Sequence, residues 1–295
     1  MICIKLDWLD KIFLIFLAIS FAFNIYLATS YPLQPDEGTH LLLAEFYKDL
    51  ISNFDKHHFN FEKIYDFSIS YLILYPKLQV FSYPPVYHLS TGLLYFLSFS
   101  AFVGRFVTIL YFLGTAVLIY KTSELLFNRK NIGIIAAILF SLTPFTFSYA
   151  SYTALTDYAS YFWSFLAIFL FLKGIKNNNS IYLASSGVSS ALTFLSRYQS
   201  LVIVFTLMIY YLLSKDNLKI KLKGVILIFV PFLILVLPYV LVFLKLEGLS
   251  ISKIIVSAYS GGGGLPKVFS FAYFFYYFYA YLIQTFFVGL LLFLL

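Results

Sequence analysis

The sequence predicts an all-α membrane protein, a polytopic transmembrane helical bundle of about eight spans, and two observations lead to that prediction. Of the 295 residues, 61% are hydrophobic and 11% are charged, and the mean hydropathy is +0.89. A soluble domain is usually about 25% charged, so a soluble fold is excluded. Apolar stretches that can cross a bilayer, or reach part-way through it, recur at residues 12–29, 106–127, 132–147, 158–172, 181–195, 201–213, 225–244 and 271–295.

The charged residues indicate how these spans are oriented. With the N-terminus in the cytoplasm, the inner segments hold eleven basic and four acidic residues, which equals the whole net charge of +7. Such an excess of Lys and Arg on one side is the positive-inside pattern of membrane proteins. The basic residues therefore set the orientation of the chain, and no nucleic-acid partner is expected. We expect a multi-pass protein of the cell membrane with its functional face outside the cytoplasm.

The connection between the first two spans, residues 30–104, is unusually long. Loops of roughly 75 residues are usually functional or carry structure of their own. Residues 35–51 mix apolar and charged positions, and residues 84–99 are aromatic and apolar, so we expect two amphipathic helices along the membrane surface. The whole chain, 1–295, is expected to form one membrane domain with a flexible outer loop at 245–270. Because the sequence ends inside an apolar stretch, we also expect a short or C-terminally incomplete member of its class.

An acidic motif, QPDEGTH at residues 34–40, directly follows the first span. Pro35 and the two acids after it are typical of a helix start. Asp36 and His40 are four residues apart and share one helix face, whereas Glu37 points about 100° away. Two adjacent acids at a membrane surface are unfavourable unless something solvates or uses them. The motif is either a helix N-terminus with a solvated histidine or part of an active site.

Three more charged residues belong on the same outer face in this topology. Asp157 is the only acid between the third and fourth predicted spans, and it is either a helix cap or a cap that also serves a site. Arg105 and Arg197 could hold a phosphate through paired N–H groups. The alternative for Arg197 is an interfacial anchor that extends to lipid headgroups.

The spacing of these motifs resembles the GT-C superfamily of membrane glycosyltransferases. The chain shows Pro-Asp-Glu-x-x-His after the first span, YPPVYH at residues 83–88, and Gly104-Arg105 at the start of the second span. The nearest branch is the protein O-mannosyltransferase and aminoarabinose-transferase-like group, which is glycosyltransferase family 39-like. Aminoarabinose transferases usually carry a Lys before the two prolines, and this chain has Tyr83 there, which argues against that branch.

The resemblance implies a glycosyltransferase that uses a polyprenyl-phosphate sugar as its donor at the extracytoplasmic face. Asp36 would be the general base and Asp157 the second acid of the family, with Glu37 beside Asp36 as the third catalytic candidate. The substrate-binding candidates are His40, Tyr83, His88, Arg105, Arg197 and Lys77.

The chemistry of such a donor agrees with one catalytic carboxylate. A sugar joined to phosphate already has a good leaving group, so the enzyme has to position the substrates, take a proton from the acceptor and neutralise the phosphate. One displacement of this kind inverts the anomeric centre. No cofactor is required, although some relatives bind a divalent metal, for which the acids and His40 offer ligands without a diagnostic spacing.

The expected partners are the polyprenyl-phosphate sugar, membrane lipid, and a protein, glycan or lipid acceptor. A transporter or lipid carrier without glycosyl transfer is the main alternative, and a non-catalytic scaffold subunit is the third. Transporters commonly place ionisable groups near the middle of the membrane. The predicted spans hold ionisable groups only near their ends, which disfavours an ion-coupled transporter.

Overall fold

The computed structural model describes residues 7–57, 60–75, 83–143, 152–213 and 218–246. All regular structure in this part of the chain is helical, as the sequence predicts. The chain divides into two compact units, Met1–Phe243 and Leu244–Leu295, and the features that follow belong to the first. The outer loop expected at 245–270, the last predicted span at 271–295 and Lys77 lie outside the described residues.

Four apolar segments of the described helices are long enough to cross a membrane. They are α1 (Trp8–Ser30), α6 (Ala101–Phe127), α8 (Asp157–Lys176) and Ile220–Leu241 within α11 (Leu218–Leu246). The shorter apolar helices are α7 (Lys130–Ser141), α9 (Ser180–Phe194) and α10 (Val202–Leu212), the last preceded by the single turn η2 (Tyr198–Leu201). Each coincides with a predicted span, but α7 ends at Ser141, earlier than the predicted end at residue 147. The chain is therefore an all-α helical membrane protein.

Local sequence explains where several of these helices begin and turn. Asp7 caps α1 by accepting a hydrogen bond from the backbone N–H of Asp10, and the Asp10 side chain accepts a hydrogen bond from the backbone N–H of Asp7. Asn128 ends α6 with φ at 55°, and Asn178 lies between α8 and α9 with φ at 46°. Asparagine tolerates this left-handed conformation better than most side chains, so each one allows the chain to reverse between two packed helices.

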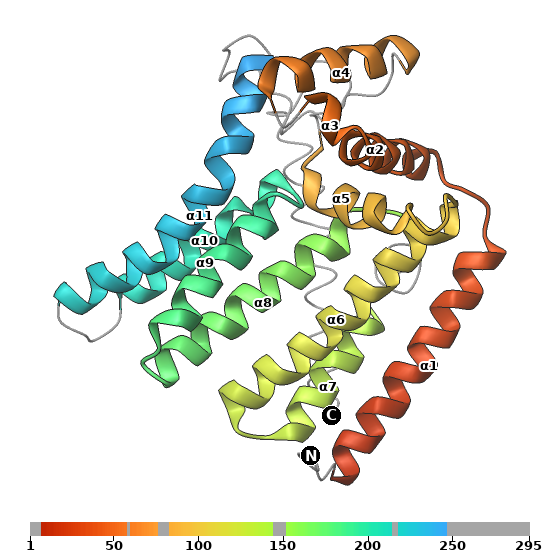
Figure 1. Cartoon of the computed structure of the whole chain (residues 1–295). Coiled ribbons are helices and arrows are strands. Elements are labelled where there is room, and N and C mark those ends of the chain that lie inside the picture. Colours follow the sequence, from red (N-terminus) through yellow and green to blue (C-terminus); the bar gives the residue numbers. More distant parts are fainter. Residues whose placement is uncertain (1–6, 58–59, 76–82, 144–151, 214–217, 247–295) are drawn as a thin grey trace, which may run out of the picture. The chain divides into compact units, whose positions relative to one another are not determined.

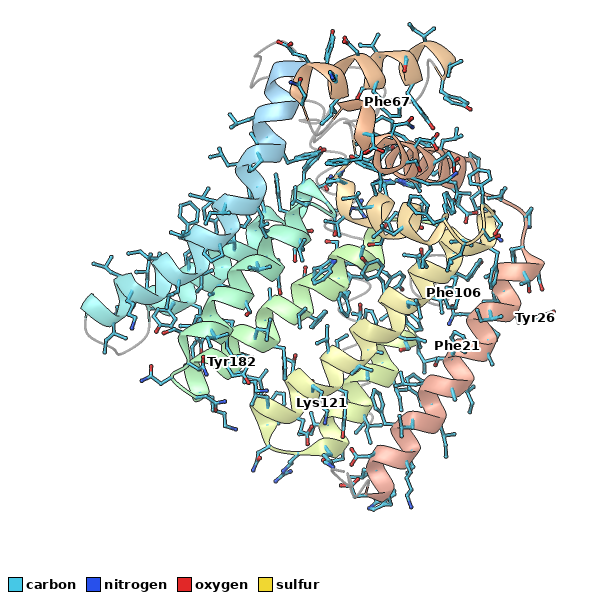
Figure 2. The ribbon with its side chains drawn as sticks, in the orientation of Figure 1. Phe21, Tyr26, Phe67, Phe106, Lys121 and Tyr182 are labelled. Atoms are coloured by element: carbon cyan, nitrogen blue, oxygen red, sulfur yellow. The ribbon has the colours of Figure 1, made fainter. Side chains whose placement is uncertain are left out.

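α1 packs on α6 and α7, α6 also packs on α8, and α8 packs on α9 (Figure 1). Phe13, Ala116, Ile119 and Ala137 fill the core between α1, α6 and α7. Figure 2 shows Phe21 of α1 near Phe106 of α6, with an edge-to-face contact at 6.4 Å between ring centroids. A second core joins α8, α9, α10 and α11, where Gly187 lets the backbones of α9 and α11 approach closely.

Four helices form the long connection between α1 and α6. They are α2 (Pro35–Ser52), α3 (Phe54–His57), α4 (Phe61–Leu74) and α5 (Pro85–Leu94). The two helices predicted at 35–51 and 84–99 are present, although the second is shorter than predicted. α4 was not predicted from the sequence. Its start is marked by Asn60, whose side chain accepts hydrogen bonds from the backbone N–H groups of Glu62 and Lys63.

α5 is attached to the membrane helices rather than lying free beside them. The Tyr87 hydroxyl donates to the Gly104 carbonyl at 3.0 Å, and the Val86 N–H donates to the Leu195 carbonyl at 2.9 Å. α2 packs on α5 (Figure 1), where a Cβ at Gly92 would lie 2.6 Å from the Ala44 carbonyl oxygen. The end of α9 and the starts of α2, α5 and α6 are therefore fixed relative to one another.

A buried ion pair between Glu37 and Arg105 joins four segments at this end. Two parallel hydrogen bonds of 2.8 Å and 2.7 Å link the guanidinium to the carboxylate, and the side chains are 4% and 0% exposed. Arg105 donates its remaining N–H groups to the carbonyls of Ala28, Tyr31 and Pro32. Glu37 also accepts from the N–H groups of Gln34 and Ala154. The pair therefore ties the end of α1, the start of α2, α6 and the segment before α8 together.

We expect Glu37→Gln to lower the free energy of unfolding by about 3–5 kcal/mol, because it leaves the Arg105 charge buried without a partner. Glu45→Gln on the same helix is the matched control, since Glu45 and Lys48 form a partly exposed pair that contributes no more than about 1 kcal/mol. Unfolding of both variants by SDS in mixed micelles, followed by loss of helix, measures the difference. Equal, small losses would contradict the role given to the buried pair.

Candidate active site

Asp36 and Glu37 are adjacent in sequence but have different surroundings. Glu37 is buried, and each of its carboxylate oxygens accepts two hydrogen bonds. Burial alone would raise the pKa of Glu37, but the bonds from Arg105 and the two backbone N–H groups outweigh it and lower the pKa. Asp36 is exposed, and no described residue forms a hydrogen bond or ion pair with its side chain. Asp36 is therefore the acid of this pair that is available to a substrate.

Asp157 and Arg197, forty residues apart in sequence, form an ion pair. Asp157 is the first residue of α8, and Arg197 follows the end of α9. Thr156, the residue that precedes α8, makes no capping bond through its side chain. The Asp157 carboxylate therefore holds the Arg197 guanidinium, while the other guanidinium N–H groups have no partner in the described part of the chain.

The Tyr83 hydroxyl is affected by the charges of one acid, Asp36, and one cation, Arg197. Burial and the charge of Asp36 raise the pKa of the Tyr83 hydroxyl, and the charge of Arg197 opposes that rise. The hydroxyl is thus within the electrostatic reach of both side chains. These electrostatic effects and the Asp157–Arg197 ion pair link Asp36, Tyr83, Arg197 and Asp157, which we call the outer cluster.

His40 and His88 lie beside the outer cluster and are buried. His40 Nδ1 is 2.9 Å from His88 Nε2, and His88 Nδ1 is 2.9 Å from the Pro84 carbonyl oxygen. Burial and the nearby Arg197 charge lower the pKa of His40 to about 4, against the weaker effect of Glu37. Burial and His40 also lower the pKa of His88 well below its ordinary value. Both rings are therefore neutral near pH 7.

The structure changes the roles of two predicted site residues. All five N–H groups of Arg105 donate to Glu37 and to backbone carbonyls, so none remains for a phosphate. The Glu37 carboxylate is likewise fully occupied, so it is not available as a base. Arg105 and Glu37 therefore hold together the segments that carry the candidate site.

Three tyrosines near the outer cluster were missed by the sequence analysis. The Tyr198 and Tyr239 hydroxyls are 2.7 Å apart, and Tyr239 also donates to the Tyr83 carbonyl at 3.4 Å. The buried Tyr47 hydroxyl has no hydrogen-bond partner among the described residues. No local pattern separates these three from the other tyrosines of a chain that holds 26.

The described residues also bear on metal binding. Within them, no three His, Cys, Asp or Glu side chains are grouped closely enough to hold a metal ion. Glu37 and the Nδ1 atoms of His40 and His88 are already occupied by bonds within the protein.

The histidine pair predicts a pH dependence of stability. Since the pKa of His40 falls from 6.5 to about 4 on folding and that of His88 also falls, the unfolded chain binds protons first. Stability is therefore full above about pH 6.5 and decreases as the pH falls toward 4, by at most about 1.4 kcal/mol per histidine and pH unit.

We expect the double variant His40→Asn/His88→Asn to lose this slope between pH 6.5 and 4.5. SDS unfolding at several pH values measures it. A wild-type slope that persists in the double variant would show that other groups cause the dependence.

Comparison with known proteins gives one match. The family described as dolichyl-phosphate-mannose-protein mannosyltransferase matches residues 82–242, which is more than half of the chain. The matched region contains Tyr83, His88, Asp157 and Arg197, whereas Asp36, Glu37 and His40 precede it. No curated protein and no solved structure matches the chain.

The match agrees with the all-α membrane fold. Its description points to membrane glycosyltransferase activity. The chain belongs to the dolichyl-phosphate-mannose-protein mannosyltransferase family.

Proposed function

We propose that the chain transfers mannose from a polyprenyl-phosphate carrier to an acceptor hydroxyl at the extracytoplasmic face of the membrane, with inversion at the anomeric carbon. The observation that carries this proposal is the arrangement of the outer cluster. The charges of an exposed carboxylate, Asp36, and of a guanidinium with N–H groups left over, Arg197, both act on the Tyr83 hydroxyl. A base and a cation together are what transfer from a sugar phosphate requires.

Each group of the cluster then has a task. The acceptor oxygen forms a bond to the anomeric carbon while the bond from that carbon to the phosphate oxygen breaks, and its electron pair stays on the phosphate. Asp36 takes the proton that the acceptor oxygen loses. Arg197 neutralises the departing phosphate, and Asp157 positions Arg197 through their ion pair. One displacement without a covalent intermediate on the protein inverts the configuration.

The distribution of charge supports an extracytoplasmic site. The outer cluster lies at the end of the bundle where α1 ends and α6 and α8 begin. At the opposite end, Lys130 at the start of α7 forms ion pairs with Asp7 and Asp10 at the start of α1. Further basic residues of that end are Lys121, Arg129, Lys173 and Lys176. An excess of positive charge marks the cytoplasmic end of a membrane protein, so the cluster opens on the other side.

Two further candidates complete the proposed site. Tyr83, whose hydroxyl is within reach of the charges of both Asp36 and Arg197, is proposed to contact the sugar phosphate. Lys77 lies outside the described residues, and its contact with the phosphate stays a prediction from the sequence.

We expect Asp36→Asn to reduce mannosyl transfer by about 10²–10⁴-fold, because the amide cannot take the acceptor proton. The assay incubates the purified protein in liposomes with radiolabelled polyprenyl-phosphate mannose and membrane-derived acceptors, and it measures donor consumption and the anomeric configuration of the product. Folding should be unchanged, since Asp36 bonds to no described residue.

Asp66→Asn is the matched control, because Asp66 is another exposed acid of the same connection, on α4. We expect Asp66→Asn to keep wild-type transfer. Transfer by Asp36→Asn within a few-fold of wild type would contradict the base assignment. A wild-type protein that consumes no polyprenyl-phosphate sugar would contradict the donor class.

A further inference from the structure

Two buried histidines from different helices form a hydrogen-bonded pair in the candidate site. His40 on α2 and His88 on α5 have ring centroids 5.2 Å apart and an interplanar angle of 26°. The Tyr83 ring meets the His40 ring edge-on at 4.8 Å. The pair therefore has one well-defined arrangement, held by two helices that pack on each other.

The hydrogen bonds fix which nitrogen carries each proton. A carbonyl oxygen can only accept, so His88 Nδ1 must donate to Pro84. Because His88 is neutral, its Nε2 has a lone pair and must accept from His40 Nδ1. His40 is neutral too, so its proton is on Nδ1 and its Nε2 has a lone pair.

The His40 Nε2 atom is left as an acceptor without a partner. The protein uses Nδ1 of His40 and both ring nitrogens of His88, but no described residue donates to His40 Nε2. Asp36 lies one helical turn before His40, so both residues lie on the same face of α2. The charge of Arg197 also reaches the His40 ring. The acceptor therefore belongs to a ring that shares a helix face with the proposed base and that touches Tyr83.

The geometry points to His40 as a specificity-determining residue whose Nε2 accepts a hydrogen bond from one hydroxyl of the donor sugar, with His88 as the positioning residue that fixes its tautomer. A sugar whose phosphate contacts Tyr83, as proposed above, would lie beside His40, because the Tyr83 and His40 rings meet edge-on at 4.8 Å. A hydroxyl is the sugar group that can donate to a lone pair. This inference rests on the proposed function, because it assigns a contact of the same donor.

His40→Asn tests the contact with little change in the fold. The Asn amide can keep a donor to His88 but has no acceptor at the position of Nε2. We measure kcat/KM of wild type and variant with polyprenyl-phosphate mannose and with each monodeoxy analogue of that donor. With the full sugar we expect a loss of about tenfold in the variant, as for one hydrogen bond. With one analogue, the one that lacks the contacting hydroxyl, variant and wild type should be equal.

Thr39→Ala is the matched control, since Thr39 is the partly exposed neighbour of His40. We expect this control to change no donor preference. An equal loss by His40→Asn on every donor would overturn the contact while leaving the proposed function intact. A wild-type protein that consumes none of these donors would overturn both.

A second measurement needs no variant at the pair. In ¹⁵N-histidine-labelled protein with His57→Gln and His58→Gln, only His40 and His88 give signals, because the chain has four histidines. Both Nδ1 atoms should be protonated and both Nε2 atoms unprotonated at pH 7. A proton on His40 Nε2 would overturn the inference even if His40→Asn failed to fold.

Discussion

Glu37 and Arg105 meet where four segments of the chain converge. Their carboxylate and guanidinium form two hydrogen bonds with each other and use their remaining bonds on the backbone of residues 28, 31, 32, 34 and 154. Neither group can move without leaving a buried charge or backbone group unsatisfied. The pair therefore holds the end of α1, the start of α2 and the start of α8 at fixed distances from α6. The outer cluster depends on this constraint, since Asp36 and Asp157 each lie within a few residues of it.

The two adjacent acids have different roles: Glu37 is structural, and Asp36 is the proposed base. On a helix, neighbouring side chains point about 100° apart, so Glu37 turns into the protein while Asp36 stays exposed. Arg105 and Arg197 show a similar contrast. Arg105 uses all its donors within the protein, whereas Arg197 bonds to Asp157 alone among the described residues. The proposed chemistry is therefore assigned to Asp36 and Arg197, the members of the two pairs whose polar groups are not fully used within the described part of the protein.

Sequence reasoning predicted the helices better than it predicted the contacts. Apolar length marks α1, α6 and α8, and Pro35 followed by two acids marks the start of α2 within one turn. α4 was not predicted, although Asn60 is a residue type that commonly caps a helix start. The Asp157–Arg197 and His40–His88 bonds join residues forty or more positions apart, so they depend on tertiary packing that no local pattern encodes. For the same reason the sequence did not reveal that the hydrogen-bonding groups of Glu37 and Arg105 are all used within the protein, and both were predicted as site residues.

The most direct test of a shared site at the outer cluster is an experimental structure of the protein in a lipid nanodisc with a non-hydrolysable polyprenyl-phosphate sugar bound. The phosphate should lie within hydrogen-bonding distance of the Arg197 guanidinium, with the Asp36 carboxylate beside the anomeric carbon. A phosphate bound at the Lys130 end of the helices, or a sugar out of reach of Asp36, would contradict the site proposed for this chain.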